Sequence, residues 1–428
     1  MKTKEKAVQG APKKKRGKLA LKIIGAIFAV ILVFVAVTAV ISLMGNKANI
    51  EKIAAFPKVE TEKQLVPVKD ENGYWTFTTD EEFKVMQLTD VHIGGGWMSL
   101  KKDAMALNAV AAMVAAEKPD LIIVTGDIAY PVPFQAGTFN NLSSAKVFAA
   151  LMEQLGVYWT LSFGNHDTEA YSYYGRDDIS EFYSGEDMKY CLYQAGPEDI
   201  DGYGNQVINV KNSEGIITQS LFMLDSHSYV DGDILGIMWK YDNIHENQVQ
   251  WYKETLGTLN AQNNALLKEM GKKENSHIKS AAFFHIPLTE QRDAWHEYRD
   301  AGYKDTENVK LHYGVAGEGG DIVFCGIHED SLFETMLELD STKAIFCGHD
   351  HENNFSVDYK GIRFTYGMSV DYLAYPGIYK LGSQRGCTMI SFFPDGGFDC
   401  RQENYYQDKY ESVYEKESVE MQEVTYES

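Results

Sequence analysis

Hydrophobic positions along the chain fall into short apolar runs and into longer segments of helical period. The short runs are rich in β-branched and aromatic residues, which favour strands. Five of these runs each end just before aspartate, asparagine or histidine, and they occupy residues 83–88, 121–125, 157–163, 280–284 and 343–347. Two further strands are expected at residues 207–210 and 221–224. A period near 3.6 predicts helices at residues 103–116, 141–155 and 243–256. Strands alternating with helices predict an α/β fold.

The longest apolar run lies near the N-terminus. Residues 23–44, from Ile23 to Met44, carry no charge over 22 positions. As a helix this run would extend about 33 Å, which is enough to cross one bilayer. A signal peptide usually has an apolar region of about 7–15 residues, so the run is long for one, although cleavage near residues 36–39 is an alternative. We therefore predict one transmembrane helix that acts as a signal anchor.

The segment before this run is basic. Residues 1–22 contain nine Lys or Arg side chains and one acidic residue, Glu5. Because positively charged flanks stay on the cytoplasmic side, residues 1–22 are expected in the cytoplasm and the remainder of the chain outside it. The sequence thus predicts a single-pass protein of the cell membrane with an extracytoplasmic catalytic body.

Composition divides the remainder into three parts. Residues 45–80 are polar and punctuated by glycine, asparagine and proline from Gly45 onward, which predicts a stalk without helix. Residues 81–404 carry the strand and helix patterns of one domain. Residues 405–428 are polar and acidic without apolar periodicity, which predicts a disordered tail. Inside the domain, the composition of residues 168–205 predicts a long insertion near the ends of the predicted strands. This insertion either selects substrate or is a solvated loop.

The side chains that follow the five strands are those that bind divalent transition metals. Ligands at the carboxyl ends of neighbouring strands converge on one crevice in open α/β sheets. Two carboxylates, one amide and four imidazoles suit manganese, iron, zinc or nickel better than calcium. These seven candidates are Asp90, His92, Asp127, Asn165, His285, His349 and His351. We predict two divalent ions, and one further histidine, His166, remains for catalysis.

The spacing of these residues fits a shared site. Asp90 and His92, and likewise His349 and His351, are two apart, which places each pair on one face of extended chain. A glycine before Asp127 lets the backbone approach closely, and its carboxylate can bridge two cations. Two divalent ions, two carboxylates and a bridging hydroxide leave a net positive charge, which suits a phosphate ester.

The pattern is specific because all five ligand-bearing segments occur together and in a fixed order along the chain. Residues 225–227 repeat the Asp-x-His spacing, and residues 232–233 and 320–321 repeat Gly-Asp. The four residues Gly-Asn-His-Asp at 164–167 are expected by chance only about once in 10⁵ positions. The order of the segments along the chain sets the repeats aside.

At these residues the chain resembles the calcineurin-like metallophosphoesterases, over residues 83–393. The resemblance implies a four-layer α/β/β/α sandwich of two mixed sheets. It implies that His166 contacts phosphate and protonates the leaving oxygen. It also assigns Asp90, His92, Asp127 and His351 to one metal and Asp127, Asn165, His285 and His349 to the other. The phrases at residues 282–288 and 346–351 look most like a branch related to the purple acid phosphatases.

One position departs from the family pattern. Many members carry an acidic residue three positions after the bridging aspartate, where this chain has Tyr130. Purple acid phosphatases have tyrosine there as an iron(III) ligand, but they lack the histidine equivalent to His92. We expect His92 to bind metal, and Tyr130 and Asp167 to lie beside the ligands. A ferric, purple centre is the alternative.

The net charge of the chain limits which partners it is expected to bind. The chain has a formal net charge of −21. Setting residues 1–22 aside leaves a body of about −29, which would repel nucleic acid, so no binding to nucleic acid is expected. The predicted function is hydrolysis of phosphate esters, with attack by a metal-bridging hydroxide and His166 as general acid.

Two alternatives stay open. One is a phosphodiesterase acting on a nucleotide, a lipid head group or a wall polymer, and the other is a non-catalytic binding protein on the same fold. The motifs do not distinguish monoesters from diesters. They also leave the metal, the substrate and the oligomeric state undefined.

Overall fold

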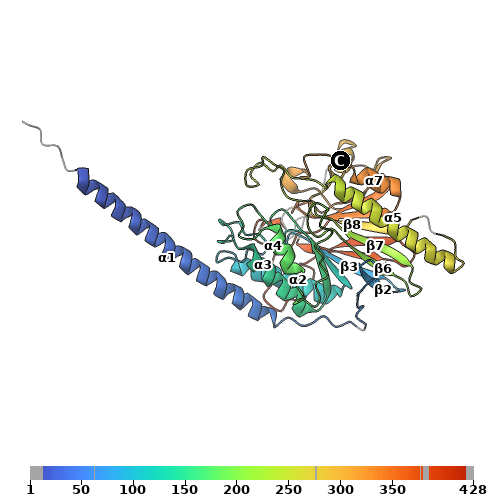
Figure 1. The fold of residues 1–428 in the computed structure, drawn as a ribbon, viewed down its shortest axis with the longest axis horizontal. Helices are drawn as coiled ribbons and strands as arrows, with labels where there is room; N and C mark the ends of the chain where they lie inside the picture. The colour runs from blue at the N-terminus through green and yellow to red at the C-terminus, as the bar shows by residue number, and fades with distance from the viewer. Residues whose placement is uncertain (1–12, 62, 275–276, 376, 379–384, 421–428) are drawn as a thin grey trace, which may run out of the picture.

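A computed structural model describes residues 13–420 apart from residues 62, 275–276, 376 and 379–384. A long N-terminal helix projects from a body in which helices surround β-sheet (Figure 1). Most of the basic segment, residues 1–12, and the last residues of the tail, 421–428, lie outside the described part of the chain.

The body contains two mixed β-sheets, which agrees with the predicted α/β class. The larger sheet has nine strands in the order β1 (Val68–Lys69), β2 (Trp75–Thr78), β6 (Gln206–Lys211), β7 (Ile217–Met223), β8 (Lys279–Phe283), β10 (Thr342–Cys347), β12 (Ile362–Tyr366), β11 (Ser356–Tyr359) and β9 (Val309–Tyr313). The smaller sheet has the order β14 (Phe398–Asn404), β13 (Gly386–Phe392), β3 (Phe83–Leu88), β4 (Leu121–Thr125) and β5 (Tyr158–Ser162). Strands β3, β4 and β5 are parallel to one another, as are β7, β8, β10 and β12.

The helices connect and cover these strands. They are α1 (Lys13–Ile53), α2 (Leu100–Glu117), α3 (Asn141–Leu155), α4 (Arg176–Tyr183), α5 (Glu246–Glu269), α6 (Thr289–Asp300) and α7 (Leu332–Leu339), with a 3₁₀ turn η1 (Glu318–Gly320). Helix α3 has the predicted bounds because Asn140 caps its start, accepting a hydrogen bond from the Ser143 backbone, and Gly156 ends it at φ 75°. Helix α5 is longer than predicted.

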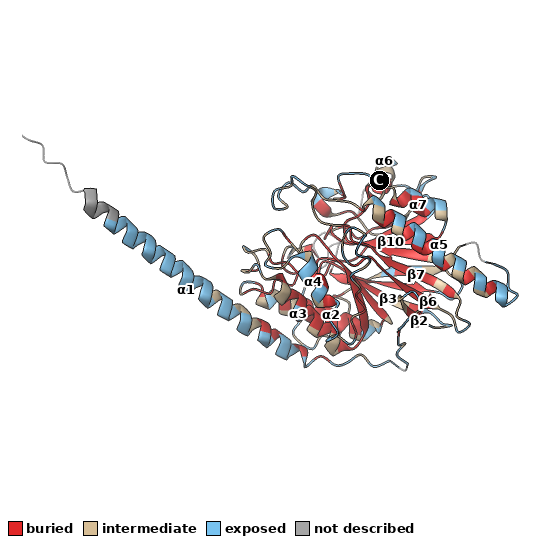
Figure 2. Ribbon diagram, viewed as in Figure 1, coloured by how far each residue is buried: buried red, intermediate tan, exposed pale blue. Residues whose placement is uncertain are grey.

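The central strands of the larger sheet are apolar on both faces because each face meets a different core. In β8, Ala281 and Phe283 belong to the core that includes the smaller sheet and helices α2 and α3. Their neighbours Ala282 and Phe284 pack in a second core with α5, α6 and α7. Figure 2 shows the buried strands in red between helices with pale blue outer faces. Uniform burial of parallel strands is expected when helices or a second sheet cover both faces.

The expected absence of helix is wrong at the start of residues 45–80. Helix α1 continues through Gly45 to Ile53, and Asn46 and Asn49 are buried. Asn46 Nδ2 donates to Gly95 O at 2.7 Å, and Asn49 Nδ2 donates to Leu100 O at 3.1 Å. Side-chain hydrogen bonds to the body therefore replace the expected break. Strands β1 and β2 extend the larger sheet into the same segment.

The tail is also more ordered than its composition suggests. Tyr405 and Tyr410 are 1% and 2% exposed, respectively. The Tyr414 ring meets Phe56 edge to face at 5.6 Å, and its backbone N–H donates to Asn108 Oδ1 at 3.1 Å. Well-spaced tyrosines thus dock residues 405–414 onto helices α1 and α2, a signal that polarity alone conceals.

Candidate metal centre

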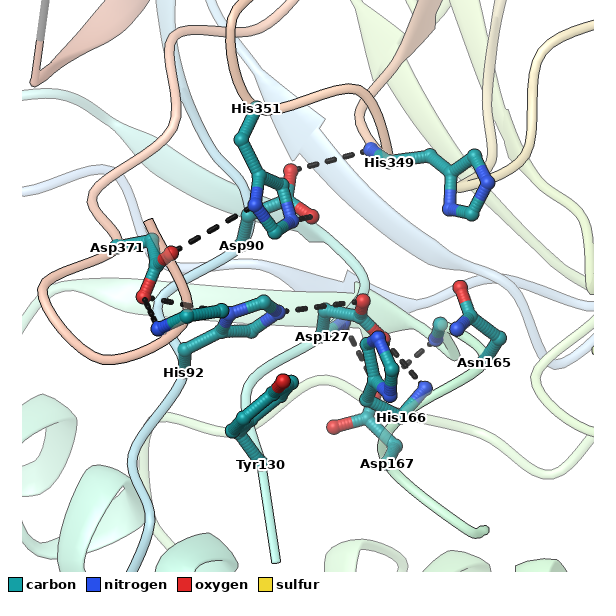
Figure 3. Close-up of polar contacts among 12 residues, drawn as sticks. Asp90, His92, Asp127, Tyr130, Asn165, His166, Asp167, His349, His351 and Asp371 are labelled. Atoms are coloured by element: carbon teal, nitrogen blue, oxygen red, sulfur yellow. Dashed lines mark hydrogen bonds and ion pairs between the residues drawn. The ribbon is translucent and has the colours of Figure 1, made fainter. Parts of the chain in front are cut away.

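The predicted ligands lie where strands of both sheets end. Asp90 and Asp127 each follow their strand, β3 or β4, by two residues, and Asn165 follows β5. On the larger sheet, His285 and His349 each follow their strand, β8 or β10, by two residues. The structure brings the seven candidates to one buried site across the carboxyl edges of the two sheets (Figure 3).

One group of side chains lies at the carboxyl ends of β3, β4 and β10. Asp90, His92, Asp127 and His351 each offer one atom within 4.8 Å of the others. His92 Nε2 lies 3.3 Å from Asp127 Oδ2, and His351 Nε2 lies 3.2 Å from Asp90 Oδ1. All four side chains are buried.

A second group shares Asp127 with the first. His285 Nε2 lies 3.2 Å from Asp127 Oδ2 and 3.2 Å from Asn165 Oδ1. The same nitrogen lies 3.3 Å from His349 Nδ1. Because Asp127 Oδ2 faces His92 on one side and His285 on the other, its carboxylate stands between the two groups.

The donor set fits transition-metal ions. Ligands about 2.0–2.2 Å from one ion lie about 3–3.5 Å from one another, which matches the separations in both groups. Asp90 Oδ1 is buried and faces His351 Nε2, itself a candidate ligand, at 3.2 Å. Two imidazole nitrogens, one on His285 and one on His349, also face each other, an arrangement that a shared cation would stabilise. The identity of the metal is not shown by these residues.

Electrostatics holds the carboxylates ionised. Burial raises the pKa of Asp127, but the charges of His285 and His166 outweigh it and bring the pKa well below its usual value. Burial lowers the pKa of His285, yet Asp127 raises it to about 9. For His349, burial and the neighbouring His285 both lower the pKa. Charge pairing thus decides the direction of the pKa shifts of Asp127 and His285, whereas desolvation is the main cause of the shift of His349.

Backbone strain concentrates at the ligands. Asp90, His92, Asp127 and His349 have φ values of 49°, 52°, 54° and 80°. Residues other than glycine seldom adopt this left-handed region, and each such position costs on the order of 1 kcal/mol or more. Gly348 is required for a different reason, because a Cβ there would collide with Thr89 Oγ1. Four strained ligands in one centre indicate a site that the fold maintains at a cost in stability.

A family model described as calcineurin-like phosphoesterase matches residues 83–353. The chain belongs to this family. That assignment confirms the resemblance read from the five motifs, and the matched residues include every predicted metal ligand.

The curated relatives of this phosphoesterase include plant and yeast proteins. "Probable inactive purple acid phosphatase 28" of Arabidopsis thaliana is 27% identical over 70% of this chain and 73% of its own. "Probable inactive purple acid phosphatase 14" of the same plant is 29% identical over 70% and 73%. "Phosphatase DCR2" of Saccharomyces cerevisiae is 27% identical over 65% of this chain and 45% of its own. These distant relatives confirm the likeness to the purple acid phosphatase branch.

Two solved structures illustrate the range of fold similarity. A dimetal phosphatase from Danio rerio covers 77% of this chain and 98% of its own, at 12% identity and a TM-score of 0.47. A purple acid phosphatase from seeds of yellow lupin (Lupinus luteus) covers 81% and 57%, at 13% identity and a TM-score of 0.40.

His166 has a carboxylate partner that the sequence analysis missed. Its Nδ1 lies 2.7 Å from Oε1 of Glu169, which is 6% exposed. The family pattern often supplies this acid three residues after the bridging aspartate, but here it comes three residues after the histidine itself. Residue 169 falls in the predicted insertion 168–205, and the Gly-Asn-His-Asp-Thr-Glu run carried the signal.

Tyr130 lies beside the ligands, as predicted, and its hydroxyl is engaged elsewhere. The ring stacks on His92 with centroids 4.5 Å apart and meets His166 edge to face at 4.8 Å. Its hydroxyl donates to Gln135 Oε1 at 2.7 Å. Burial raises the pKa of Tyr130 far above its usual value.

Asp167 and Asp371 support the ligands from opposite sides. Asp167 Oδ2 accepts the backbone N–H groups of Asp127 and Gly164, at 3.0 and 2.8 Å, which fixes the turn that carries the bridging carboxylate. The sequence analysis missed Asp371: its Oδ1 lies 3.3 Å from His92 Nδ1 and its Oδ2 3.6 Å from His351 Nδ1. Such a carboxylate orients the two rings so that their Nε2 atoms face the centre (Figure 3).

Proposed function

We propose that this protein is a membrane-anchored, two-metal hydrolase of phosphate esters. The observation that carries the proposal is a complete set of seven metal-binding groups beside the His166–Glu169 pair. Asp90, His92, Asp127 and His351 would hold one ion, and the second would take Asp127, Asn165, His285 and His349. We infer the layer order α/β/β/α from the two cores described above.

The ions would neutralise charge on the phosphoryl group and supply an activated water as nucleophile. The residues of the chain orient this reaction. The His166 side chain is 24% exposed, so it can meet substrate, and its Nδ1 is held by Glu169. Nε2 is therefore the nitrogen that donates a proton to the leaving oxygen. Glu169 stabilises the imidazolium that carries this proton.

Membrane anchoring rests on α1. This helix contains one segment long and apolar enough to cross a bilayer, and its apolar side chains are exposed, as the pale blue helix in Figure 2 shows. Exposed side chains argue against a buried core helix of a soluble protein. A cleaved signal segment is the alternative, but it would remove a helix whose final turns are hydrogen-bonded to the body through Asn46 and Asn49.

A second candidate function is non-catalytic binding on the same fold. Relatives named as inactive purple acid phosphatases motivate it. The intact ligand set and the buried Glu169 beside His166 favour catalysis in this chain. A diesterase is a variant of the first proposal and uses the same residues.

The test is an assay of the full chain in detergent on paired substrates. We expect metal-dependent hydrolysis of nitrophenyl phosphate or bis-nitrophenyl phosphate after loading with manganese, zinc, iron or nickel. The ratio of the two rates separates monoesterase from diesterase. Absence of turnover with every metal, in protein that still binds two ions per chain, would favour the non-catalytic alternative.

Topology has its own test. Protease added to intact cells should degrade the body and spare only a short N-terminal fragment, because residues 1–22 would lie in the cytoplasm. A body that is digested only after cell lysis would place the metal centre in the cytoplasm instead.

A further inference from the structure

An exposed apolar loop stands over the metal centre. Residues 234–239, which we call the apolar lip, lie within the connection between β7 and α5. Their large side chains are exposed by 62% (Ile234), 54% (Leu235), 69% (Ile237), 48% (Met238) and 64% (Trp239). Single exposed apolar residues are common, but five in one short loop mark an interaction surface.

The base of this loop is ordered. Tyr229 and Tyr241 form an antiparallel bridge and stack with ring centroids 5.5 Å apart. The Val230 N–H donates to Lys240 O at 3.0 Å, and the Lys240 N–H donates to Asp233 Oδ2 at 3.0 Å. The lip is therefore held outward by a hydrogen-bonded stem. Leu235 and Trp239 adopt strained φ values of 55° and 53°, and the Trp239 ring meets Phe324 edge to face at 6.2 Å.

The same stem contacts the metal ligands. Asn165 Nδ2 donates to the Tyr229 hydroxyl at 2.9 Å, and that hydroxyl donates to Glu169 Oε1 at 3.3 Å. The Tyr241 ring meets the His349 ring edge to face at 4.2 Å. Gly236 of the lip lies so close to Tyr229 that a Cβ there would be 2.7 Å from its ring. The lip, a metal ligand and the acid partner of His166 are thus in one contact chain.

Aromatic residues are also exposed on two other loops, one between β4 and α3 and one between β5 and α4 that carries His166. Phe134 is 88% exposed and Tyr173 is 66% exposed. The Tyr173 backbone N–H donates to Phe139 O at 2.9 Å, and the two rings lie 5.9 Å apart. This segment follows Glu169 directly, since the Ser172 N–H donates to Glu169 O. Apolar side chains therefore lie on both flanks of the candidate site.

Helix α1 runs beside the loop that follows His92. Phe34, in the middle of the apolar run, meets the Trp97 ring edge to face at 6.1 Å. Closer to the body, Asn46 binds Gly95, three residues after His92. Figure 1 shows the loop before α5, in yellow-green, projecting on the side of the body from which α1 extends. In this view the lip therefore projects toward the side of the body on which α1 would cross a bilayer.

We propose that the apolar lip inserts into the bilayer crossed by α1 and that the metal centre hydrolyses the phosphomonoester of a lipid in that bilayer. This inference rests on the proposed function and names its substrate class. The hydroxide of a water forms a new bond to phosphorus, and the P–O bond to the lipid breaks. The lipid alkoxide takes its proton from His166, so the products are a lipid alcohol and phosphate. Only the phosphate needs to reach the metal centre, while the acyl chains stay in the membrane.

Insertion can be measured without turnover. The full chain, reconstituted in phosphatidylcholine vesicles, is compared with and without bromine on the acyl chains, which quenches tryptophan within the bilayer. Trp239→Phe should remove part of the quenchable emission. Trp75→Phe is the matched control, because Trp75 lies in β2, between β1 and β6 of the larger sheet. Unchanged quenching in Trp239→Phe would overturn insertion of the lip.

Substrate class is measured with the same preparations. Wild type and the double variant Ile237→Ser with Trp239→Ser are assayed on dioleoyl phosphatidic acid in vesicles and on water-soluble nitrophenyl phosphate. The variant should lose about tenfold or more on the lipid and retain its rate on the soluble ester. Equal loss on both substrates would mean that the lip only positions Tyr229 and the metal centre.

The outcomes separate this inference from the proposed function. Wild type that hydrolyses nitrophenyl phosphate but not the lipid would keep the phosphatase and overturn the lipid substrate. Wild type that hydrolyses neither, with two ions bound, would overturn the proposed function. In that case the quenching experiment alone would still decide whether the lip enters the membrane.

Discussion

In most proteins charged side chains are exposed and apolar side chains are buried. The metal centre departs from the first part of this rule and the apolar lip from the second. At the centre, Asp90, Asp127 and His285 are fully buried although all three can carry charge. In the lip, Ile237 and Trp239 are more than 60% exposed although neither is polar. Buried charge without a partner and exposed hydrocarbon without a cover are both costly.

The difference teaches what each region lacks. The centre is rich in ligand atoms that face one another, so its missing partner is cationic and small. The lip offers a surface without hydrogen-bonding specificity, so its missing partner is apolar and extended. We propose that metal ions complete the first region and lipid the second, and Tyr229 contacts both, through Asn165 and through Gly236.

The largest effect is expected at the bridging carboxylate. Asp127→Ala should remove both ions, because Asp127 Oδ2 stands between His92 and His285. Elemental analysis of protein purified without chelator should fall from close to two equivalents per chain to near none. Asp233→Asn, at another Gly-Asp pair, is the control and should keep both ions. Full metal content in Asp127→Ala would contradict the shared bridge.

His166→Ala tests chemistry without disturbing the ligands. The variant should retain its metals and lose turnover by roughly 10²–10⁴-fold, the range for removal of a general acid. The loss should be greatest for alkyl phosphates and smaller for nitrophenyl esters, whose leaving oxygen scarcely needs a proton. His245→Ala, a histidine of an ion pair outside the centre, is the matched control. The same fractional loss on both substrates would leave His166 only a role in positioning phosphate.

The sequence predicted the buried metal centre better than the exposed apolar lip. Metal ligands follow apolar strands at short, regular spacings, so Asp90, Asp127 and His285 can be found by pattern. Glu169 and Asp371 escaped because their roles depend on which loop folds back onto which ring. The lip escaped for a different reason: an apolar run in a loop looks like a short strand until the structure leaves it uncovered.

A further prediction contrasts the carboxylates of the centre with a buried carboxyl group whose pKa is raised. Burial, together with Asp330 and Glu334, raises the pKa of Glu290 from 4.5 to about 7. The folded state therefore binds more protons than the unfolded state between these values, and stability falls as pH rises from 4.5 to 7. Glu290→Gln should leave stability unchanged near pH 4.5 and raise it by about 1–3 kcal/mol at pH 8.

Thermal unfolding of the detergent-solubilised chain at the two pH values measures this difference. Glu254→Gln, on the surface of α5, is the control and should show no such pH dependence. Equal stability of Glu290→Gln and wild type at pH 8 would show that the ionised form of Glu290 is not penalised by its neighbours.

The smallest effect is expected in the lip, and it completes the contrast. An apolar residue in a core loses about 2–5 kcal/mol of stability when truncated, because packing and burial are both lost. Ile237 is 69% exposed, so Ile237→Ser should change the stability of the solubilised chain by no more than about 0.5 kcal/mol. Ile345, buried in β10, provides the comparison, since Ile345→Ser should be strongly destabilising. If Ile237 is dispensable for folding, its apolar side chain serves a contact with a partner outside the chain. A marked loss of stability in Ile237→Ser would instead make the lip part of the core, and its exposure would no longer call for a membrane.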